Sequence, residues 1–240
     1  MKSAYMTAPE TYEIRDIPVP VPGEKEVLLR VRACGICGSD IGLYKMGMED
    51  RILGHEFSGD IAEVGPEVSG WKAGDRVVVE PTMPCWECYW CKHGQFNLCP
   101  YLGYTGIMEE GAFAEYVKVP AYQLHRLPDE VSYLQGALVE PLAVSLHGVM
   151  HSIMRPGDTV LVNGCGIIGQ YALLWAKALG AGLLIASEVA KARIEAAGKL
   201  ADVVINPAEM NLSDELNRLT DEVGPRVVFE CTGIPEVQAE

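Results

Sequence analysis

Four cysteines stand close together near the middle of the chain. Cys85, Cys88, Cys91 and Cys99 follow the spacing C-x2-C-x2-C-x7-C. Four thiolates at such short separations can surround one zinc ion tetrahedrally and leave no coordination position open, which is the arrangement of a structural site. Two disulfides are an alternative, but they are rare in a reducing compartment. Bacterial iron–sulfur sequences place their last cysteine at a different spacing, so the pattern favours structural zinc.

A second group of reactive side chains lies in two glycine-rich segments. Cys37 occurs in ACGICGSD, and His55 with Glu56 occurs in ILGHEFSG. The glycines indicate backbones that fold tightly against a neighbour. Cys34 and Cys37 also form a C-x-x-C pair, so thiol redox chemistry is a second interpretation. We expect no helix directly after Cys37, unlike in thioredoxin-like sites, and we expect Cys34 to close a strand and be buried.

Two histidines stand four residues apart in the segment SLHGVMHS. His147 and His151 would share one face of a helix, and this spacing can bind a metal ion. No glutamate follows His147 in the manner of H-E-x-x-H, however. An ordinary helix surface or core contact is therefore the favoured interpretation, with a metal site as the alternative.

A glycine-rich turn indicates a dinucleotide. The segment from Gly164 to Gly169 fits G-x-G-x-x-G between an apolar strand and an amphipathic helix, and its glycines would let a pyrophosphate approach the helix N-terminus. Glu188 ends the next strand, where it would accept hydrogen bonds from ribose hydroxyls and repel a 2′-phosphate, which favours NAD over NADP. A glycine turn needed only for packing is the alternative. The candidate cofactor-binding residues are Gly164, Gly166, Ile167, Ile168, Gly169, Glu188 and Arg193, the last lying along the adenine or exposed on its helix.

The sequence pattern changes near residues 150–155, which indicates two domains of an α/β protein. Up to about residue 150, short Val-rich runs at 26–33, 74–81 and 113–120 predict strands separated by turns. Beyond residue 155, apolar strands alternate with amphipathic helices, which predicts a parallel sheet covered on both faces. The expected strands are 159–164, 183–188, 203–206 and 226–233, and the expected helices are 167–180, 191–201 and 213–223. We place the domains at residues 1–152 and 153–240.

Composition limits the classes of function. The chain has 240 residues and a formal net charge of −14, so a phosphate backbone would be repelled and nucleic acid is an unexpected partner. The N-terminus has no apolar core or cleavage site typical of a secretory signal. The most apolar stretch, residues 159–186, is interrupted by polar residues and glycines, which argues against a membrane span. We expect a cytoplasmic protein.

Taken together, these motifs resemble the medium-chain, zinc-containing alcohol dehydrogenase family in its polyol and butanediol branch. The resemblance spans nearly the whole chain in the family's order. The matching segments are GICGSD, GHEFSGDIAEVG, GDRVVVEP, the four-cysteine lobe, GAFAEYVKVP, LPDEVS, GALVEPLAV and NGCGIIG. It implies a mostly-β, GroES-like catalytic domain with a zinc lobe, followed by a doubly wound Rossmann domain that binds NAD.

The resemblance also implies a catalytic zinc site. By position, Cys37 and His55 would hold the zinc, with Glu56 and Glu140 of the VEP segment as further ligands in the polyol branch. Such a ligand set leaves zinc Lewis-acidic with an open position. Ser39 would carry the proton of the substrate hydroxyl outward. The implied reaction is hydride transfer between NAD and a secondary alcohol, vicinal diol or polyol, in a homo-oligomer.

The resemblance further implies that the chain is incomplete. Members of the family continue for about another hundred residues, in keeping with two domains of ordinary size. We therefore expect a truncated Rossmann domain whose fourth strand is an uncovered edge. We also expect weak turnover or none from the chain alone, which makes a non-catalytic zinc- and dinucleotide-binding fragment the alternative function.

Overall fold

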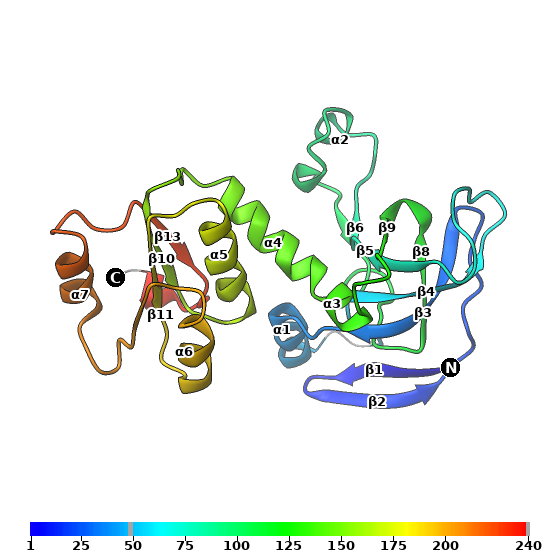
Figure 1. Cartoon of the computed structure of the whole chain (residues 1–240). Coiled ribbons are helices and arrows are strands. Elements are labelled where there is room, and N and C mark those ends of the chain that lie inside the picture. Colours follow the sequence, from blue (N-terminus) through cyan, green and yellow to red (C-terminus); the bar gives the residue numbers. More distant parts are fainter. Residues whose placement is uncertain (48–49, 239–240) are drawn as a thin grey trace. The chain divides into compact units, whose positions relative to one another are not determined.

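The chain divides into two compact units. The structure, a computed structural model, describes residues 1–47 and 50–238 (Figure 1). One unit comprises Met1–Glu140 and the other Pro141–Glu240. The division falls in the first turn of helix α4 (Val139–Met150). The domain boundary that we place after residue 152 lies just beyond the other end of this helix, and it stays a prediction.

The first unit is built mainly from antiparallel strands. Its largest sheet has five strands in the order β8-β3-β4-β5-β9, and two ribbons, β1-β2 and β6-β7, complete it. Its elements are β1 (Lys2–Ala8), β2 (Thr11–Asp16), β3 (Glu26–Cys34), α1 (Gly38–Met46), β4 (Phe57–Val64), β5 (Arg76–Val79), β6 (Thr82–Met83), α2 (Tyr89–Lys92), β7 (Gly103–Tyr104), β8 (Tyr116–Pro120), β9 (Leu124–Arg126) and α3 (Tyr133–Ala137), with short 3₁₀ turns η1 (Phe96–Leu98) and η2 (Ala121–Gln123). The strands predicted at 26–33, 74–81 and 113–120 are confirmed as β3, β5 and β8.

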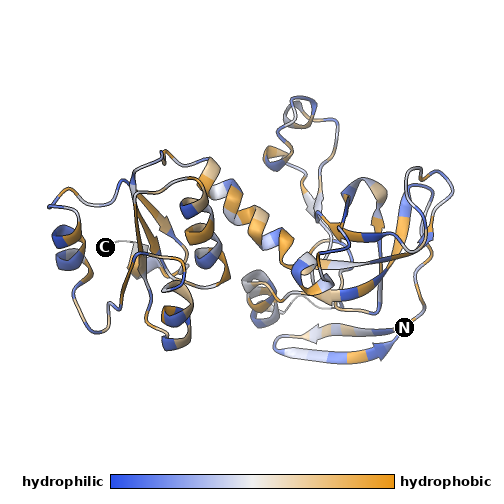
Figure 2. Cartoon of the chain, viewed as in Figure 1, coloured by the Kyte–Doolittle hydropathy of each residue, from blue (hydrophilic) through white to orange (hydrophobic). Residues whose placement is uncertain are grey.

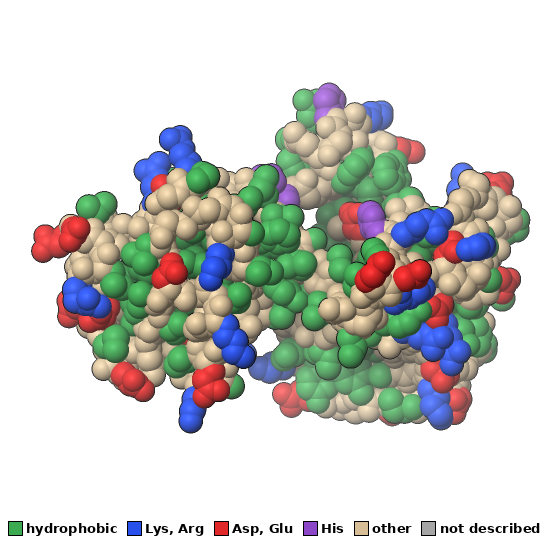
Figure 3. All heavy atoms as spheres, viewed as in Figure 1, with side chains coloured by type: hydrophobic (Ala, Val, Ile, Leu, Met, Phe, Trp, Pro, Cys, Tyr) green, Lys and Arg blue, Asp and Glu red, His purple; other side chains and the backbone are tan. Residues whose placement is uncertain are grey.

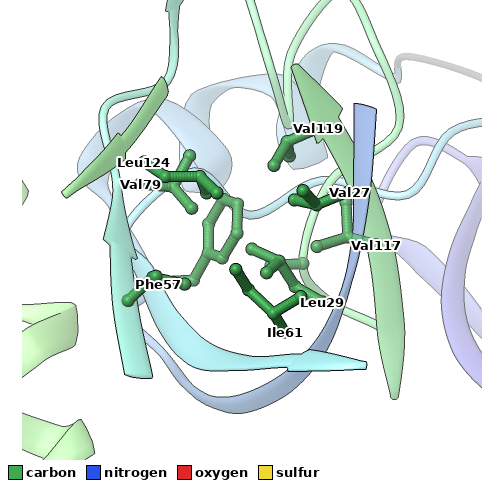
Figure 4. Packing of buried hydrophobic residues seen from close by; sticks show 10 residues of the cluster. Val27, Leu29, Phe57, Ile61, Val79, Val117, Val119 and Leu124 are labelled. Atoms are coloured by element: carbon green, nitrogen blue, oxygen red, sulfur yellow. The ribbon is translucent and has the colours of Figure 1, made fainter. Parts of the chain in front are cut away.

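Alternating side chains of these strands form the core of the first unit. Phe57, 1% exposed, lies among Leu29, Ile61 and Val79 (Figure 4). Burying an aromatic ring of this size contributes on the order of 2–3 kcal/mol. Phe57 is the first residue of β4 and directly follows His55 and Glu56. Its burial therefore also fixes the position of these two residues just before the strand.

The loop between β3 and β4 differs from expectation. Helix α1 begins at Gly38, immediately after Cys37, so the expectation that no helix follows this cysteine is wrong. The backbone N–H of Cys37 donates to Asp40 Oδ2 at 2.8 Å and so closes the first turn of the helix. Cys34 closes β3 as predicted, but it is half-buried rather than fully buried.

The second unit contains a four-stranded parallel sheet, as predicted. The strand order is β12-β11-β10-β13, and the strands are mostly hydrophobic (Figure 2). Sequence periodicity predicts the elements of this unit to within a few residues, except for the short last helix, α8, which no prediction covers. They are β10 (Thr159–Asn163), α5 (Ile167–Ala178), β11 (Leu183–Ser187), α6 (Lys191–Ala197), β12 (Val203–Ile205), α7 (Leu212–Leu219), β13 (Val227–Glu230) and α8 (Pro235–Gln238).

Helices cover both faces of this parallel sheet. Val160 and Val162 of β10 pack with α5, whereas Leu161 between them packs with leucines of α7 on the opposite face. Figure 1 shows α7 across the sheet from α5 and α6. The order reverses at β10, which pairs with β11 on one side and β13 on the other. Ligands of doubly wound sheets bind at such a switch point, beyond the carboxyl ends of the strands.

Acidic and basic side chains are interspersed over the face shown in Figure 3. This distribution, with the net charge of −14, gives no support to a nucleic-acid surface. None of the helices within residues 1–47 and 50–238 is long and apolar enough to cross a bilayer.

Candidate metal and nucleotide sites

The four cysteines of the lobe come together in space. Their Sγ atoms all lie within 4.8 Å of one another, and Cys85 Sγ is 3.9 Å from Cys91 Sγ. In a tetrahedron with Zn–S bonds of about 2.3 Å the sulfur atoms are about 3.8 Å apart. The spacing of the donor atoms therefore fits a zinc ion.

Backbone N–H groups of the lobe point at its sulfur atoms. The N–H of Cys88 donates to Cys85 Sγ at 3.4 Å, and that of Cys91 donates to Cys88 Sγ at 3.5 Å. Hydrogen bonds from the backbone of Glu87 and Cys88 lower the pKa of Cys85 to about 7, which favours the thiolate that binds metal. All eight cysteines of the chain lie within the described residues and all are free, so the lobe is not held by disulfides.

A second group of donors lies where β3, α1 and β4 meet. Cys37 Sγ, a ring nitrogen of His55 and a carboxylate oxygen of Glu56 lie within 4.8 Å of one another. Both His55 and Glu56 are only 6% exposed. A thiolate, an imidazole and a carboxylate form a donor set suited to zinc, and three protein ligands leave a position open. The residues present therefore fit a catalytic metal ion.

The backbone of Gly35 makes room for Glu56. Its N–H donates to the carbonyl oxygen of Glu56 at 2.7 Å, and a Cβ at this position would lie 2.2 Å from Glu56 Oε2. A side chain at this position would therefore force the carboxylate of Glu56 to move. A β-bulge near Val31–Ala33 bends β3 just before this approach. Gly35 thus provides the close contact that the sequence pattern indicates, whereas a Cβ at Gly38, on the other side of Cys37, would meet nothing within 4 Å.

Asp40 is a member of this site that sequence reasoning missed. The side chain is 2% exposed, and its Oδ1 atom lies 3.6 Å from Nδ1 of His55. Neither atom has a hydrogen-bond partner in the structure. A carboxylate behind a metal-binding histidine commonly fixes its tautomer and orientation. The only signal in the sequence is an acid three residues after Cys37 in GSD.

The electrostatics of the cluster favour a positive charge at its centre. Burial alone lowers the pKa of His55, but Asp40 and Cys37 beside the ring raise it to about 10. Burial raises the pKa of Glu56 above its ordinary value, and the nearby carboxylate of Asp40 raises it further. A cation bound among these groups would remove the repulsion between the acids.

Glu140 and Ser39, the other two residues predicted for the catalytic site, lie outside this group of three donors. Glu140, in the first turn of α4, does not belong to the three-residue group of donors that the described part of the chain forms. Burial raises its pKa, and His55, Glu56 and Asp40 influence it electrostatically. Ser39 is exposed in the first turn of α1.

The glycine-rich turn lies between β10 and α5, as predicted. At Gly169 a Cβ would lie 1.9 Å from the carbonyl oxygen of Gly164, so only glycine allows the first turn of α5 to pack against the loop. The N–H of Cys231, after β13, donates to the carbonyl oxygen of Asn163 at 2.8 Å. The turn therefore lies at the switch point of the sheet. Gly166 precedes α5, which begins with Ile167, an exposed residue, and Ile168, which is half-buried.

Glu188 directly follows β11 and is buried. Its Oε2 accepts from the N–H of Cys165 at 2.8 Å, and its Oε1 accepts from those of Val189 and Ala190. Burial raises the pKa of Glu188, but these hydrogen bonds outweigh it and hold the pKa below its ordinary value. A carboxylate has about four lone-pair positions, so about one remains for a ribose hydroxyl. Arg193 is exposed on α6, with NH1 3.9 Å from Glu188 Oε2.

Comparison with known proteins yields matches over both units. The model of the alcohol dehydrogenase GroES-like domain family matches residues 23–129, and that of the zinc-binding dehydrogenase family matches residues 168–240. Sorbitol dehydrogenase of Bacillus subtilis is 38% identical over 244 residues, which cover 98% of this chain and 69% of that protein.

Solved structures agree with this match. The 2R,3R-butanediol dehydrogenase from Bacillus subtilis superposes with a TM-score of 0.89 at 37% identity, covering 98% of this chain and 72% of the other. A structure from Sinorhizobium meliloti, described as a zinc-binding dehydrogenase bound to NADP, gives a TM-score of 0.91 at 33% identity, covering 99% and 71%. The chain therefore belongs to the zinc-containing, medium-chain alcohol dehydrogenase family, in its polyol dehydrogenase branch.

Proposed function

We propose that this protein transfers a hydride between NAD and a secondary alcohol, a vicinal diol or a polyol. The observation that carries the proposal is the buried group of Cys37, His55 and Glu56. Its members are distant in sequence, and their donor atoms suit a zinc ion with an open position. Membership of a family of zinc-binding dehydrogenases supports the same assignment.

Each residue has a defined part in this proposal. Cys37, His55 and Glu56 would hold zinc, with Glu140 as a further or exchangeable ligand. Bound zinc would supply Lewis acidity toward the substrate hydroxyl, and NAD would supply the hydride acceptor. Asp40 orients the ring of His55 as a positioning residue. Ser39, exposed at the start of α1, passes the hydroxyl proton toward solvent.

The substrate and cofactor classes rest on two acids. Glu140 stands in the VEP segment where the better-known alcohol dehydrogenases have a cysteine, and this difference favours polyols and diols. Glu188 places a negative charge beside the nucleotide turn, and such a charge repels the 2′-phosphate of NADP. Because a relative binds NADP, this preference is open to a direct test. A homo-oligomer in the cytoplasm stays a prediction.

A thiol redox function is disfavoured by the state of Cys34. Burial raises the pKa of its thiol to about 12, whereas a redox-active cysteine needs an accessible thiolate. Its Sγ donates to the carbonyl oxygen of Gly35. This local contact is sufficient to explain a cysteine in C-x-x-C spacing that takes no part in chemistry.

The test is NAD reduction by the zinc-loaded protein with sorbitol, a vicinal butanediol and a primary alcohol. From this chain alone we expect weak turnover at most, with the polyol or the diol as substrate and with NAD preferred over NADP. His55→Asn should abolish turnover, whereas Cys34→Ser, whose thiol lies outside the donor group, should retain most of it. Turnover that survives His55→Asn would refute the proposal. A protein that binds zinc and NAD without any turnover would instead support the non-catalytic fragment.

A further inference from the structure

Two exposed histidines stack on the last turn of α4. The ring centroids of His147 and His151 are 4.0 Å apart, and the rings are inclined by 30°. Both residues belong to the second unit and are exposed. Residues four apart on a helix lie on the same face, so both rings can direct a nitrogen toward one point outside the helix.

A backbone hydrogen bond orients the ring of His151. Its Nδ1 atom lies 2.9 Å from the backbone carbonyl oxygen of His147. A carbonyl oxygen only accepts hydrogen bonds, so Nδ1 is the donor in this contact. In the neutral ring, Nε2 then carries the lone pair that a metal ion can bind. Metal-binding histidines commonly donate their other ring N–H to a backbone carbonyl in this way. The hydrogen bond therefore orients His151 and leaves its outer nitrogen free for a ligand.

The position on the helix also favours a cation. α4 has 12 residues and ends at Met150. The carbonyl groups of its last turn form the negative end of the helix dipole, which attracts positive charge. The face therefore combines two imidazole donors with a local negative potential.

We propose that His147 and His151 form a surface site that chelates a divalent transition-metal ion such as Ni²⁺, Cu²⁺ or Zn²⁺. The two imidazole nitrogens would bind the ion, and water would complete its coordination. Imidazole suits these metals, and Cu²⁺ should bind most tightly of the three. The site uses no residue of the zinc lobe or of the group around His55, so it is independent of the dehydrogenase function.

The test uses the untagged, zinc-loaded protein after dialysis, with Ni²⁺ as the probe in titration calorimetry and in retention on an immobilised-nickel column. We expect one Ni²⁺ per chain. Because chelation needs both rings, His147→Ala and His151→Ala should each weaken binding by about tenfold or more. His125→Ala is the matched control, because His125 is exposed in the first unit and its ring lies beside Glu80 rather than beside another histidine. This variant should bind Ni²⁺ like the unmodified protein.

Two results would overturn the proposal. One is an unmodified protein that takes up no Ni²⁺ beyond the level of His147→Ala. The other is a His125→Ala variant that loses binding as much as the α4 variants do. The variants His147→Gln and His151→Gln keep good helix formers on α4. They should lose Ni²⁺ while their circular dichroism and bound zinc stay unchanged.

Discussion

Replacing Gly35 with alanine should weaken zinc binding by Cys37, His55 and Glu56 and leave zinc binding by the four-cysteine lobe unchanged. The new methyl group would lie 2.2 Å from Glu56 Oε2 and 3.2 Å from Glu56 Cβ. The perturbation is local because the φ angle of Gly35 is not positive, so alanine can adopt the same backbone conformation. The backbone hydrogen bond from Gly35 to Glu56 is also kept. It therefore acts on the position of one carboxylate.

The magnitude follows from these distances. Nonbonded atoms prefer separations of about 3.5 Å, so the carboxylate must move by roughly 1 Å. Metal–ligand distances tolerate only about 0.2 Å, so Glu56 would leave the coordination shell. Displacing groups that merely orient a ligand already weakens metal binding by about 10–100-fold. We expect at least that loss for Gly35→Ala, together with an overpacking cost of about 1–3 kcal/mol in the free energy of unfolding.

The assay is competition for zinc against a chelator, with the metal content of the protein measured at each chelator concentration. Gly35→Ala should release one zinc early and keep the lobe zinc. Gly42→Ala is the matched control because a Cβ there meets nothing within 4 Å. It should bind zinc normally and gain about 0.5–1 kcal/mol of stability. Equal retention of both ions by Gly35→Ala and the unmodified protein would refute the reasoning.

Three further predictions concern other parts of the chain. Phe57→Ala should lower the free energy of unfolding in urea by about 3–5 kcal/mol; a loss below about 1 kcal/mol would contradict its place in the core. Glu188→Gln should lower the free energy of unfolding at neutral pH, and the gap in this free energy between the variant and the unmodified protein should narrow in acid. The pKa of Glu188 is lower in the folded protein than its ordinary value of 4.5. Its contribution to stability is therefore complete above pH 4.5 and is lost as the pH falls through the folded-state pKa. Urea unfolding at several pH values checks this, and a constant gap would argue against it. Cys91→Ser should lose the lobe zinc and admit protease cleavage within residues 85–99, whereas a protease-resistant variant with full zinc would exclude a structural ion there.

The parts of the molecule that local patterns determine could be predicted from sequence. The lobe's four cysteines lie within residues 85–99, so their spacing alone brings them to one ion. The parallel sheet follows from apolar strands that alternate with amphipathic helices. The glycine turn also follows from its place between a strand and a helix.

Features that depend on tertiary contacts could not be predicted in the same way. Gly38 and Gly42 disfavour a helix after Cys37. The contacts that offset this are the bond from the Cys37 N–H to Asp40 at the helix start and those of Tyr44, whose ring stacks on Tyr12 and whose hydroxyl donates to the carbonyl oxygen of Glu10. Asp40 was missed for a related reason. An acid in the first turn of a helix is an ordinary capping residue, and only the fold brings it near His55.

Glu188 illustrates a third limit of sequence reasoning. The motif predicts an acid at the end of the second strand of the parallel sheet, and in the structure Glu188 directly follows β11. The pattern gave no sign, however, that the carboxylate also accepts three backbone N–H groups of the surrounding loops. These bonds preorganise the acid and leave about one lone-pair position for a ligand.

Counting bound zinc in two cysteine variants tests the central claim most directly. Elemental analysis of the dialysed protein should give two zinc ions per chain, and Cys34→Ser should also give two, because Cys34 lies outside both donor groups. Cys37→Ser should give one. If Cys37→Ser retains both ions, or if the unmodified protein binds only the lobe zinc, then Cys37, His55 and Glu56 do not hold a metal.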